Sequence, residues 1–525
     1  MCLLRRSFGS IDRGRNLRLA TVLPPALWLG LAIVCTSPVA ADDQPAAASS
    51  AELKDFEETW QVVYIGNSRI GFSRSTSGRM QQGGREIIVT DNEISMTISR
   101  FKQSLKTKAF THSEETPEGE LLSFRFEMQN PPAAPTRSSG RVEGDKLLLT
   151  TETNGKPTTK ELKWDKTIKS PVFQDRLLRE NPLKPGEKRV LQSFDPQFGK
   201  RNTVTLSAGA LEVVPLLGGK SQKLLTVAVS QSLAPLITTT EYLDEKGVAL
   251  KSSVSLANMI MYAVSKEEAL KALTGEEVDL AIATLVKAGD IERSAETREV
   301  VYRVSIPGED PEKTLSQGPT QSIERVSPHS VDLTVRAIAP AAEAPAGAGQ
   351  KPGREYLAPN DYIQSDDKLV QKHAAEAVKT ESDPWKQALL MERWVSDNLK
   401  QKNFSTLLAS AAEVAKDLSG DCTEHAVLLA AMCRARGIPS RVVVGLVYVR
   451  SLTSFGGHMW TEVFVRGQWI PLDATLGRGG IAADHIKFAD SSFADDGDSS
   501  PLTAFLPLVG ALGKMKIEVR SVKYP

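Results

Sequence analysis

A cysteine at the start of a helix, followed by a histidine and an aspartate on a hairpin, constrains this chain more than any other feature. Cys422 lies in Ser-Gly-Asp-Cys-Thr-Glu-His, directly after Gly420 and Asp421. The spacing Asp421-x-x-Glu424 is typical of a capping box, so we expect a helix over 421–436 with the thiol in its first turn. N–H groups and the helix dipole there favour an anion, which lowers the pKa of a thiol and raises its thiolate fraction.

Two downstream residues complete the pattern. His458 lies in Gly-Gly-His-Met-Trp-Thr-Glu, and Asp473 lies in Trp-Ile-Pro-Leu-Asp-Ala-Thr. We expect strands at 459–465 and 468–473 joined by a tight turn, which returns Asp473 to within about two positions of His458. Asp473 would then orient the imidazole, and the second ring nitrogen of His458 would face Cys422 as a base faces a nucleophile.

The neighbouring segments predict helices packed on an antiparallel sheet. Asp383 followed by Pro384 is typical of a helix start, and apolar residues then recur at helical spacing over 384–400. The β-branched run at 441–449 indicates a buried strand beside the histidine hairpin. We therefore expect a C-terminal α+β domain.

Residues 60–261 have a β pattern instead. Segments 60–65 and 70–73 flank Gly66-Asn67, which is typical of a hairpin turn. The pattern predicts a large antiparallel β-rich region without a recognisable group of reactive side chains. His112 lies among Ser, Glu and Thr, and we expect it at the surface.

The first 41 residues predict export. Five arginines precede an apolar run at 27–35, and Val39 and Ala41 occupy the small-residue positions of a cleavage site. The run is too short for a membrane span, so no stable span is expected after cleavage; a retained anchor is the alternative. We expect a periplasmic or extracellular protein.

Four parts follow from these patterns. They are a signal peptide at 1–41, a β-rich domain at 42–272, a small β module with a linker at 273–345, and the C-terminal domain at 346–525.

Charge and cysteine content narrow the function. Lys+Arg and Asp+Glu are balanced at 64 each, so no basic excess points to nucleic acid. Beyond residue 41 the cysteines are Cys422 and Cys433. They lie about 16 Å apart along one helix, too far for a disulfide. An exported protein with an accessible Cys422 thiol is expected to use it, whereas Cys433 is expected in the core.

No metal or cofactor is expected. A zinc site could draw on Cys422, His425, Cys433 and His458. Tetrahedral ligands must lie within a few ångströms of one another, and Cys433 is about three helical turns from Cys422.

Four blocks of the C-terminal region resemble the bacterial transglutaminase-like superfamily. They are Gly-Asp-Cys-Thr-Glu-His-Ala-Val-Leu-Leu, Arg-Ala-Arg-Gly-Ile-Pro-Ser-Arg-Val-Val-Val-Gly, His-Met-Trp-Thr-Glu-Val and Trp-Ile-Pro-Leu-Asp-Ala-Thr. The resemblance spans roughly 360–480. It implies a papain-like fold and a Cys-His-Asp triad, which falls on Cys422, His458 and Asp473.

The resemblance implies thiol-dependent acyl transfer from amide or peptide bonds of a protein or peptide substrate. Water as acceptor gives a protease or amidase, and an amine gives a transglutaminase; the sequence leaves both open. The alternative is a non-catalytic transglutaminase-like scaffold or peptide-binding module, with the β-rich region as its binding part.

Overall fold

The structure is a computed structural model. It describes residues 53–100, 103–129, 135–153, 156–235, 237–274, 277–340, 351–400, 409–494 and 501–525. The predicted signal peptide at 1–41 lies outside the described residues. No helix in the described ranges has the length and apolar character that a membrane span requires.

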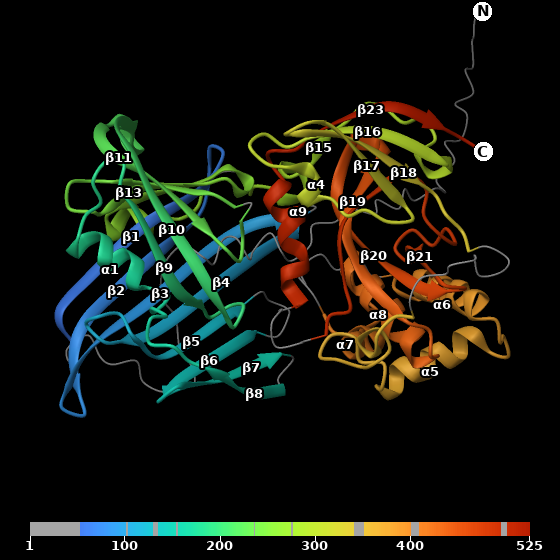
Figure 1. Ribbon diagram of the computed structural model, residues 1–525, viewed down its shortest axis with the longest axis horizontal. Coiled ribbons are helices and arrows are strands. Elements are labelled where there is room, and N and C mark those ends of the chain that lie inside the picture. Colours follow the sequence, from blue (N-terminus) through green and yellow to red (C-terminus); the bar gives the residue numbers. More distant parts are fainter. Residues whose placement is uncertain are drawn as a thin grey trace, which may run out of the picture.

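A single antiparallel sheet of 14 strands makes up the N-terminal region, at the left of Figure 1. Its order is β8-β7-β6-β5-β4-β3-β2-β1-β14-β13-β12-β11-β10-β9, so β1 and β14 pair across about 200 residues and β8 and β9 are the edges. The strands are β1 (Lys54–Ile65), β2 (Ser68–Gln82), β3 (Arg85–Arg100), β4 (Gln103–Glu115), β5 (Leu121–Gln129), β6 (Thr136–Glu143), β7 (Lys146–Thr153), β8 (Lys156–Lys163), β9 (Lys188–Asp195), β10 (Lys200–Pro215), β11 (Ser221–Gln231), β12 (Thr239–Leu243), β13 (Ala249–Val254) and β14 (Met259–Val264). Helix α1 (Phe173–Glu180) lies between β8 and β9 in sequence.

The expected first hairpin is confirmed, because β1 and β2 pair in antiparallel register on either side of Gly66-Asn67. Gly66 has φ +57°, a left-handed conformation that glycine adopts without strain. The expectation for His112 is wrong. Its strand β4 pairs on both sides, with β3 and β5, and the side chain is 6% exposed. Asp91 of β3 supplies a hydrogen-bond partner at 2.7 Å, which is why the sheet can bury this imidazole.

The C-terminal region has helices packed on a second antiparallel sheet, as expected for an α+β domain (Figure 1). Its strand order is β15-β20-β19-β22, and β21 pairs with β20 along the edge that faces away from β19. The strands are β15 (Val286–Lys287), β19 (Ser440–Val449), β20 (Ser454–Val465), β21 (Gln468–Leu472) and β22 (His485–Ser491). The helices are α5 (Lys368–Val378), α6 (Pro384–Asn398), α7 (Ala411–Asp417) and α8 (Cys422–Ala435).

A third sheet brings the end of the chain back to its middle. The order is β17-β18-β16-β23, formed by β16 (Glu299–Ser305), β17 (Gln321–Ser327), β18 (Ser330–Arg336) and β23 (Lys516–Lys523). Tyr302 of β16 donates a hydrogen bond to the Ala483 carbonyl at 2.8 Å, just before β22. The third sheet therefore contacts the segment that leads into the second.

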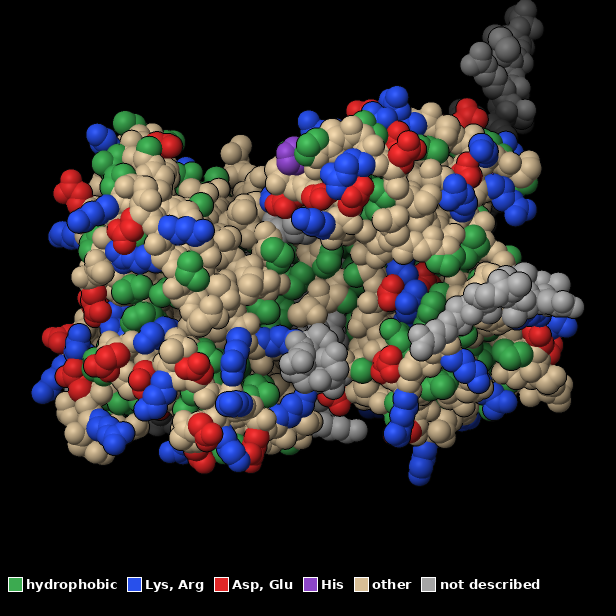
Figure 2. All heavy atoms as spheres, viewed as in Figure 1, with side chains coloured by type: hydrophobic (Ala, Val, Ile, Leu, Met, Phe, Trp, Pro, Cys, Tyr) green, Lys and Arg blue, Asp and Glu red, His purple; other side chains and the backbone are tan. Residues whose placement is uncertain are grey.

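One hydrophobic cluster runs through the molecule. It includes Val63 of β1, Val300 of β16, Val427 of α8 and Leu508 of α9 (Leu506–Ala511), all buried. A continuous core of this kind packs the large sheet and the C-terminal region together. On the face in Figure 2, acidic and basic side chains are interspersed over both halves, in keeping with the balanced net charge.

Candidate active site

Helix α8 begins as its sequence predicts, and its first residue is Cys422. The Asp421 carboxylate accepts the Thr423 N–H at 2.9 Å, and the Glu424 carboxylate accepts the Asp421 N–H at 2.9 Å, which completes the capping box. Gly420 has φ +148°, and a Cβ there would lie 2.3 Å from the Cβ of Glu424. Only glycine fits this approach, so the turn places the thiol in the first turn of α8.

The Glu424 carboxyl is fully enclosed by the start of α8. Burial raises its pKa to about 8, and the neighbouring Asp421 adds to the effect. One of its oxygens also accepts the Ala409 N–H at 3.0 Å, so the side chain ties the residues before α7 to the start of α8. Its role is to hold the turn that carries Cys422.

His458 and Asp473 meet through a two-residue hairpin turn. Strands β20 and β21 pair from Val465–Gln468 to Thr461–Leu472, and Arg466 and Gly467 both have positive φ. Asp473 follows the last pair, and the Nε2–H of His458 donates to its Oδ2 at 2.8 Å. The expected proximity of these two residues is thus seen directly.

The other ring nitrogen of His458 stands apart from this bond. Its Nδ1 is buried and has no hydrogen-bond partner among the described residues. The Trp460 ring stacks on the imidazole with centroids 6.1 Å apart. The Trp460 ring also covers Gly445, where a Cβ would lie 2.6 Å from it. Packing therefore holds the plane of the imidazole ring, and its Nδ1 forms no hydrogen bond with the described residues.

Asp473 is held from several sides. Its Oδ1 accepts the Thr475 N–H at 2.9 Å, and its own N–H donates to Glu392 of α6 at 3.2 Å. Burial alone would raise the pKa of Asp473, but the charge and hydrogen bonds of His458 and His485 outweigh it and hold the pKa well below its usual range. The carboxylate is therefore ionised and can stabilise a protonated His458.

Sequence reasoning missed His485. Its Nε2–H donates to Asp473 Oδ2 at 3.3 Å, and its Nδ1–H donates to Asp484 Oδ1 at 2.6 Å. Arg478 donates to the other Asp484 oxygen at 3.1 Å. The only signal in the chain is an Asp-His pair entering β22, and such a dipeptide has no spacing rule that links it to His458.

Glu392 was also missed. It is 1% exposed on α6, and burial, followed by the charge of Asp473, raises the pKa of its carboxyl to about 8. It lies 81 residues from Asp473 in sequence, so its contact with the Asp473 N–H depends on how α6 packs against the sheet.

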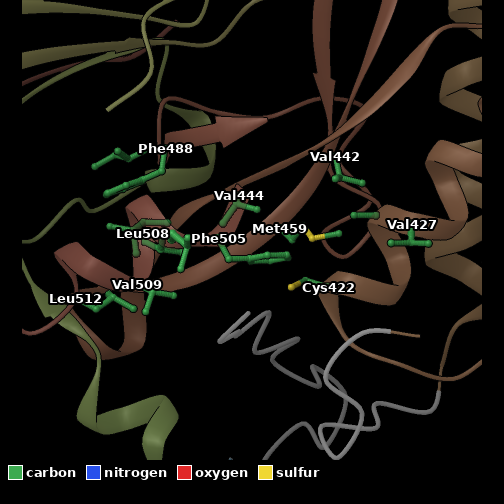
Figure 3. Packing of buried hydrophobic residues seen from close by; sticks show 14 of the residues in the cluster. Cys422, Val427, Val442, Val444, Met459, Phe488, Phe505, Leu508, Val509 and Leu512 are labelled. Carbon is green, nitrogen blue, oxygen red and sulfur yellow. The ribbon is translucent and has the colours of Figure 1, made fainter. Parts of the chain in front are cut away.

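Cys422 is placed close to the histidine strand but is not accessible. Thr461 of β20 donates to the Ala426 carbonyl of α8 at 2.9 Å, and Cys422 shares a buried cluster with Met459. Figure 3 shows Cys422 at the start of α8 near Met459. The expectation of an accessible thiol is wrong, because Cys422 is 0% exposed, as are His458 and Asp473.

Cys433 has the environment expected for a core cysteine. It is 0% exposed, and neither it nor Cys422 forms a disulfide. Burial raises the pKa of its thiol well above the usual range, and the Glu392 carboxyl adds to this. Such a thiol is inert near neutral pH.

Three side chains of the described residues come close enough to be considered as a metal site. The ligand-type atoms of His458, Asp473 and His485 lie within 4.8 Å of one another. Both imidazoles lie within hydrogen-bond distance of one Asp473 oxygen, so in this structure the three side chains form a hydrogen-bonded relay.

The comparison with protein families matches the C-terminal region. The model of the transglutaminase-like superfamily matches residues 371–474. A Haemophilus influenzae protein of uncharacterised function is 24% identical over 179 residues, which are 29% of this chain and 46% of that protein. The chain thus spans about half the length of this curated relative.

Three solved structures of low sequence identity are similar to parts of the chain. A candidate cysteine protease from Cytophaga hutchinsonii is 19% identical, covers 43% of this chain and 87% of its own, and has a TM-score of 0.26. A candidate protease from Parabacteroides distasonis is 15% identical over 67% of this chain and 64% of its own, with a TM-score of 0.17. A beta-barrel-like protein of a domain of unknown function from Brucella abortus is 13% identical over 39% of this chain and 93% of its own, with a TM-score of 0.29. These scores are too low to carry an argument about mechanism.

Proposed function

We propose that this protein, whose residues 371–474 form a transglutaminase-like superfamily domain, is a thiol-dependent acyl-transfer enzyme. The Cys422 sulfur attacks the carbonyl carbon of an amide, and His458 takes the thiol proton and returns it to the departing amine. Asp473 orients His458 and stabilises its protonated form. Water then releases the acyl group as an acid, or an amine takes it as a new amide.

The observation that carries the proposal is the pairing of His458. One ring nitrogen is bonded to Asp473, and the other is buried without a hydrogen-bond partner in the described part of the chain. A buried nitrogen without a partner costs free energy, and such a group in a folded protein often has a catalytic role. In this proposal the nitrogen acts as a base for the Cys422 thiol, which lies at the start of α8, the helix packed against β20.

The start of α8 supports the same chemistry. The positive end of the helix dipole favours a negative charge on the sulfur, and His458 adds to this once it is protonated. Because Cys422 has no exposed surface, the side chains packed over it must move before a substrate carbonyl reaches the sulfur. We therefore expect slower reaction with bulky reagents than with small ones.

The substrates in this proposal are proteins or peptides, and the site of action is outside the cytoplasm. The second part depends on the arginine-rich, apolar and small-residue pattern of residues 1–41. N-terminal sequencing of the protein from a periplasmic or extracellular fraction tests it. A start at Asp42 supports export, and a retained Met1 in a membrane fraction supports an anchor.

The two cysteines of α8 provide a matched test of the mechanism. Wild type, Cys422→Ala and Cys433→Ala are treated with a broad cysteine-directed acyl probe, with and without a primary amine, and analysed by mass spectrometry. We expect label on Cys422 in wild type and in Cys433→Ala, and none in Cys422→Ala. Amine found in the product indicates cross-linking, and free acid alone indicates hydrolysis. Label on Cys433 would contradict the mechanism.

A binding role is the second candidate, and a cavity of the large sheet favours it. The cavity has a volume of about 490 Å³ and is lined by residues between 58 and 266, among them Trp60, Phe194 and Glu241. In this reading the buried Cys422 is inert, and the large sheet holds a peptide. The labelling experiment separates the two functions, because an inert thiol takes no label below pH 8.

A further inference from the structure

Asp473 receives two imidazoles, and the proposed mechanism uses only one. Its Oδ2 accepts the N–H of His458 at 2.8 Å and the N–H of His485 at 3.3 Å. His485 enters from β22, which pairs with β19 and not with the β20–β21 hairpin. A strand outside the hairpin thus also holds this carboxylate.

The bonds of His485 define its charge. Both of its ring nitrogens lie within hydrogen-bond distance of a carboxylate oxygen, one of Asp473 and one of Asp484. A carboxylate accepts and does not donate, so both nitrogens carry hydrogen and the ring is an imidazolium. Asp484 is in turn bonded to Arg478.

Charges of opposite sign therefore alternate through the buried site. The series begins with positive Arg478 and negative Asp484, continues with positive His485 and negative Asp473, and ends at His458, the proposed base. Burial opposes charge on His485, but Asp484 and Asp473 outweigh it and raise the pKa of His485 to about 9. The relay thus stays charged over the neutral pH range.

Two further kinds of group lie near His485. They are aromatic rings, and side chains that interact with its partners Asp473 and Asp484. The rings of His458 and Trp460 have centroids 5.7 Å and 5.3 Å from its own. Tyr302 lies near enough to Asp484 to interact with it electrostatically, and Glu392 faces Asp473 from α6. Among the described residues, Asp473 and Asp484 bond His485 directly. Arg478, His458, Tyr302 and Glu392 interact with these two carboxylates and so influence His485 through them.

We infer that His485 is a positioning residue, which keeps Asp473 ionised and aimed at His458 and sets the pH range in which Cys422 is reactive. The inference rests on the proposed function. When the Cys422 proton moves from Sγ to Nδ1 of His458, no other bond changes. His458 then carries a positive charge next to the negative charge of Asp473, and the Cys422 thiolate adds a negative charge at the end of this series. The positive charge of His485 favours the thiolate and limits how tightly His458 holds its proton.

His485→Gln tests the inference, because glutamine can still donate to Asp473 but carries no charge. The rate of alkylation by iodoacetamide is measured from pH 4.5 to pH 10, which requires no substrate. Loss of a positive charge raises the pKa of both the thiol and the His458 imidazolium. We expect both limbs of the profile to move to higher pH by about one unit, with about a tenfold loss of rate at pH 6.

Two further variants keep the test decisive. Asp484→Asn keeps an oxygen that can accept the Nδ1–H of His485 but removes the negative charge that favours the imidazolium, so a smaller shift in the same direction is expected. His373→Gln is the matched control. It changes a half-buried histidine of α5 that stacks on Trp394, and its profile should equal that of wild type. If His485→Gln does not fold, as judged by circular dichroism, the Asp484→Asn profile decides.

The outcomes separate the inference from the proposed function. A folded His485→Gln protein whose profile matches wild type, or loses amplitude without a shift, overturns the positioning role. If Cys422→Ala is still labelled at the wild-type rate, the proposed function is overturned instead. A shift in His485→Gln and Asp484→Asn, with none in His373→Gln, supports the inference.

Discussion

Two regions of this molecule each contain a buried histidine–aspartate pair. Only the pair in the C-terminal domain is a candidate for a reactive site. In the large sheet, His112 bonds Asp91 at 2.7 Å; in the C-terminal domain, His458 bonds Asp473 at 2.8 Å. Both imidazoles are buried, at 6% and 0% exposure. Distance and burial alone therefore do not tell a structural pair from a catalytic one.

The difference lies in the second ring nitrogen. The Nε2 of His112 lies 3.9 Å from a Glu114 oxygen, so carboxylates flank both sides of that ring. Its proton is held firmly, and the interaction with His112 lowers the pKa of Glu114 to about 2. The second nitrogen of His458 has no hydrogen-bond partner in the described part of the chain, and a cysteine begins the helix packed on its strand. A pair becomes a candidate base when one nitrogen remains for a nucleophile.

The largest expected effect distinguishes the two buried histidines, His458 and His112, directly. His458→Ala removes the proposed base for the Cys422 thiol, so alkylation near pH 6.5 should fall by about 100-fold or more and recover in part at alkaline pH. His112→Ala removes an equally buried imidazole and should leave the rate unchanged. Iodoacetamide kinetics on both proteins measure this. Equal rates in the two variants would leave no functional distinction between the pairs.

The next effect concerns buried carboxyls, one in each region. The pKa of Glu392 is raised to about 8, and that of Glu241 in the large sheet to about 7, each by burial first. A raised carboxyl pKa adds stability below about pH 4.5, and this is lost as pH rises to the folded value. Glu392→Gln should therefore gain stability relative to wild type between pH 4.5 and 8, on the order of 1–3 kcal/mol. Glu241→Gln should gain less stability, and this gain should stop increasing near pH 7.

Chemical denaturation at pH 5 and pH 9 measures both gains. Glu392 also bonds the Asp473 N–H, so Glu392→Gln should alter the alkylation profile, whereas Glu241→Gln should not. A relative stability of Glu392→Gln that does not change with pH would show that Glu392 is ionised in the folded protein.

Local sequence rules predict the parts of the site that lie within one element or one hairpin. The capping box at Asp421 and Glu424 follows from a three-residue spacing, and the contact of His458 with Asp473 follows from period two and a two-residue turn. These features depend on neighbours in the chain, so no knowledge of the tertiary structure is needed.

The remaining parts depend on long-range pairing. His485 reaches Asp473 because β22 pairs with β19, and Glu392 does so because α6 packs beside β20. The burial of Cys422 likewise comes from elements that are distant in sequence, whereas His112 is covered by its neighbouring strands β3 and β5. No local spacing encodes these contacts, since tertiary packing selects them.

A smaller effect is expected from Cys433→Ala. The side chain is fully buried in α8, so its loss leaves a small cavity and should cost about 1 kcal/mol of unfolding free energy. Alkylation of Cys422 should keep its rate. Urea unfolding followed by circular dichroism gives the first quantity, and mass spectrometry gives the second. A large loss of labelling would mean that Cys433 supports the geometry of Cys422 as well as the core.

The smallest expected effect returns to the structural pair. Burial lowers the pKa of His112, but hydrogen bonds to Asp91 and Glu114 outweigh it and raise the pKa above its usual value. A histidine whose folded pKa is raised adds stability that is complete below its unfolded pKa, near 6.5, and lost as pH rises through the folded value. His112→Gln should therefore cost about 0.5–1 kcal/mol at pH 5.5 and less at pH 9. Urea midpoints at the two pH values measure the difference. A cost that grows toward pH 9 would mean that the neutral ring is the stabilising form. His112 would then be a neutral partner of Asp91, and the contrast with His458 would rest on the missing thiol alone.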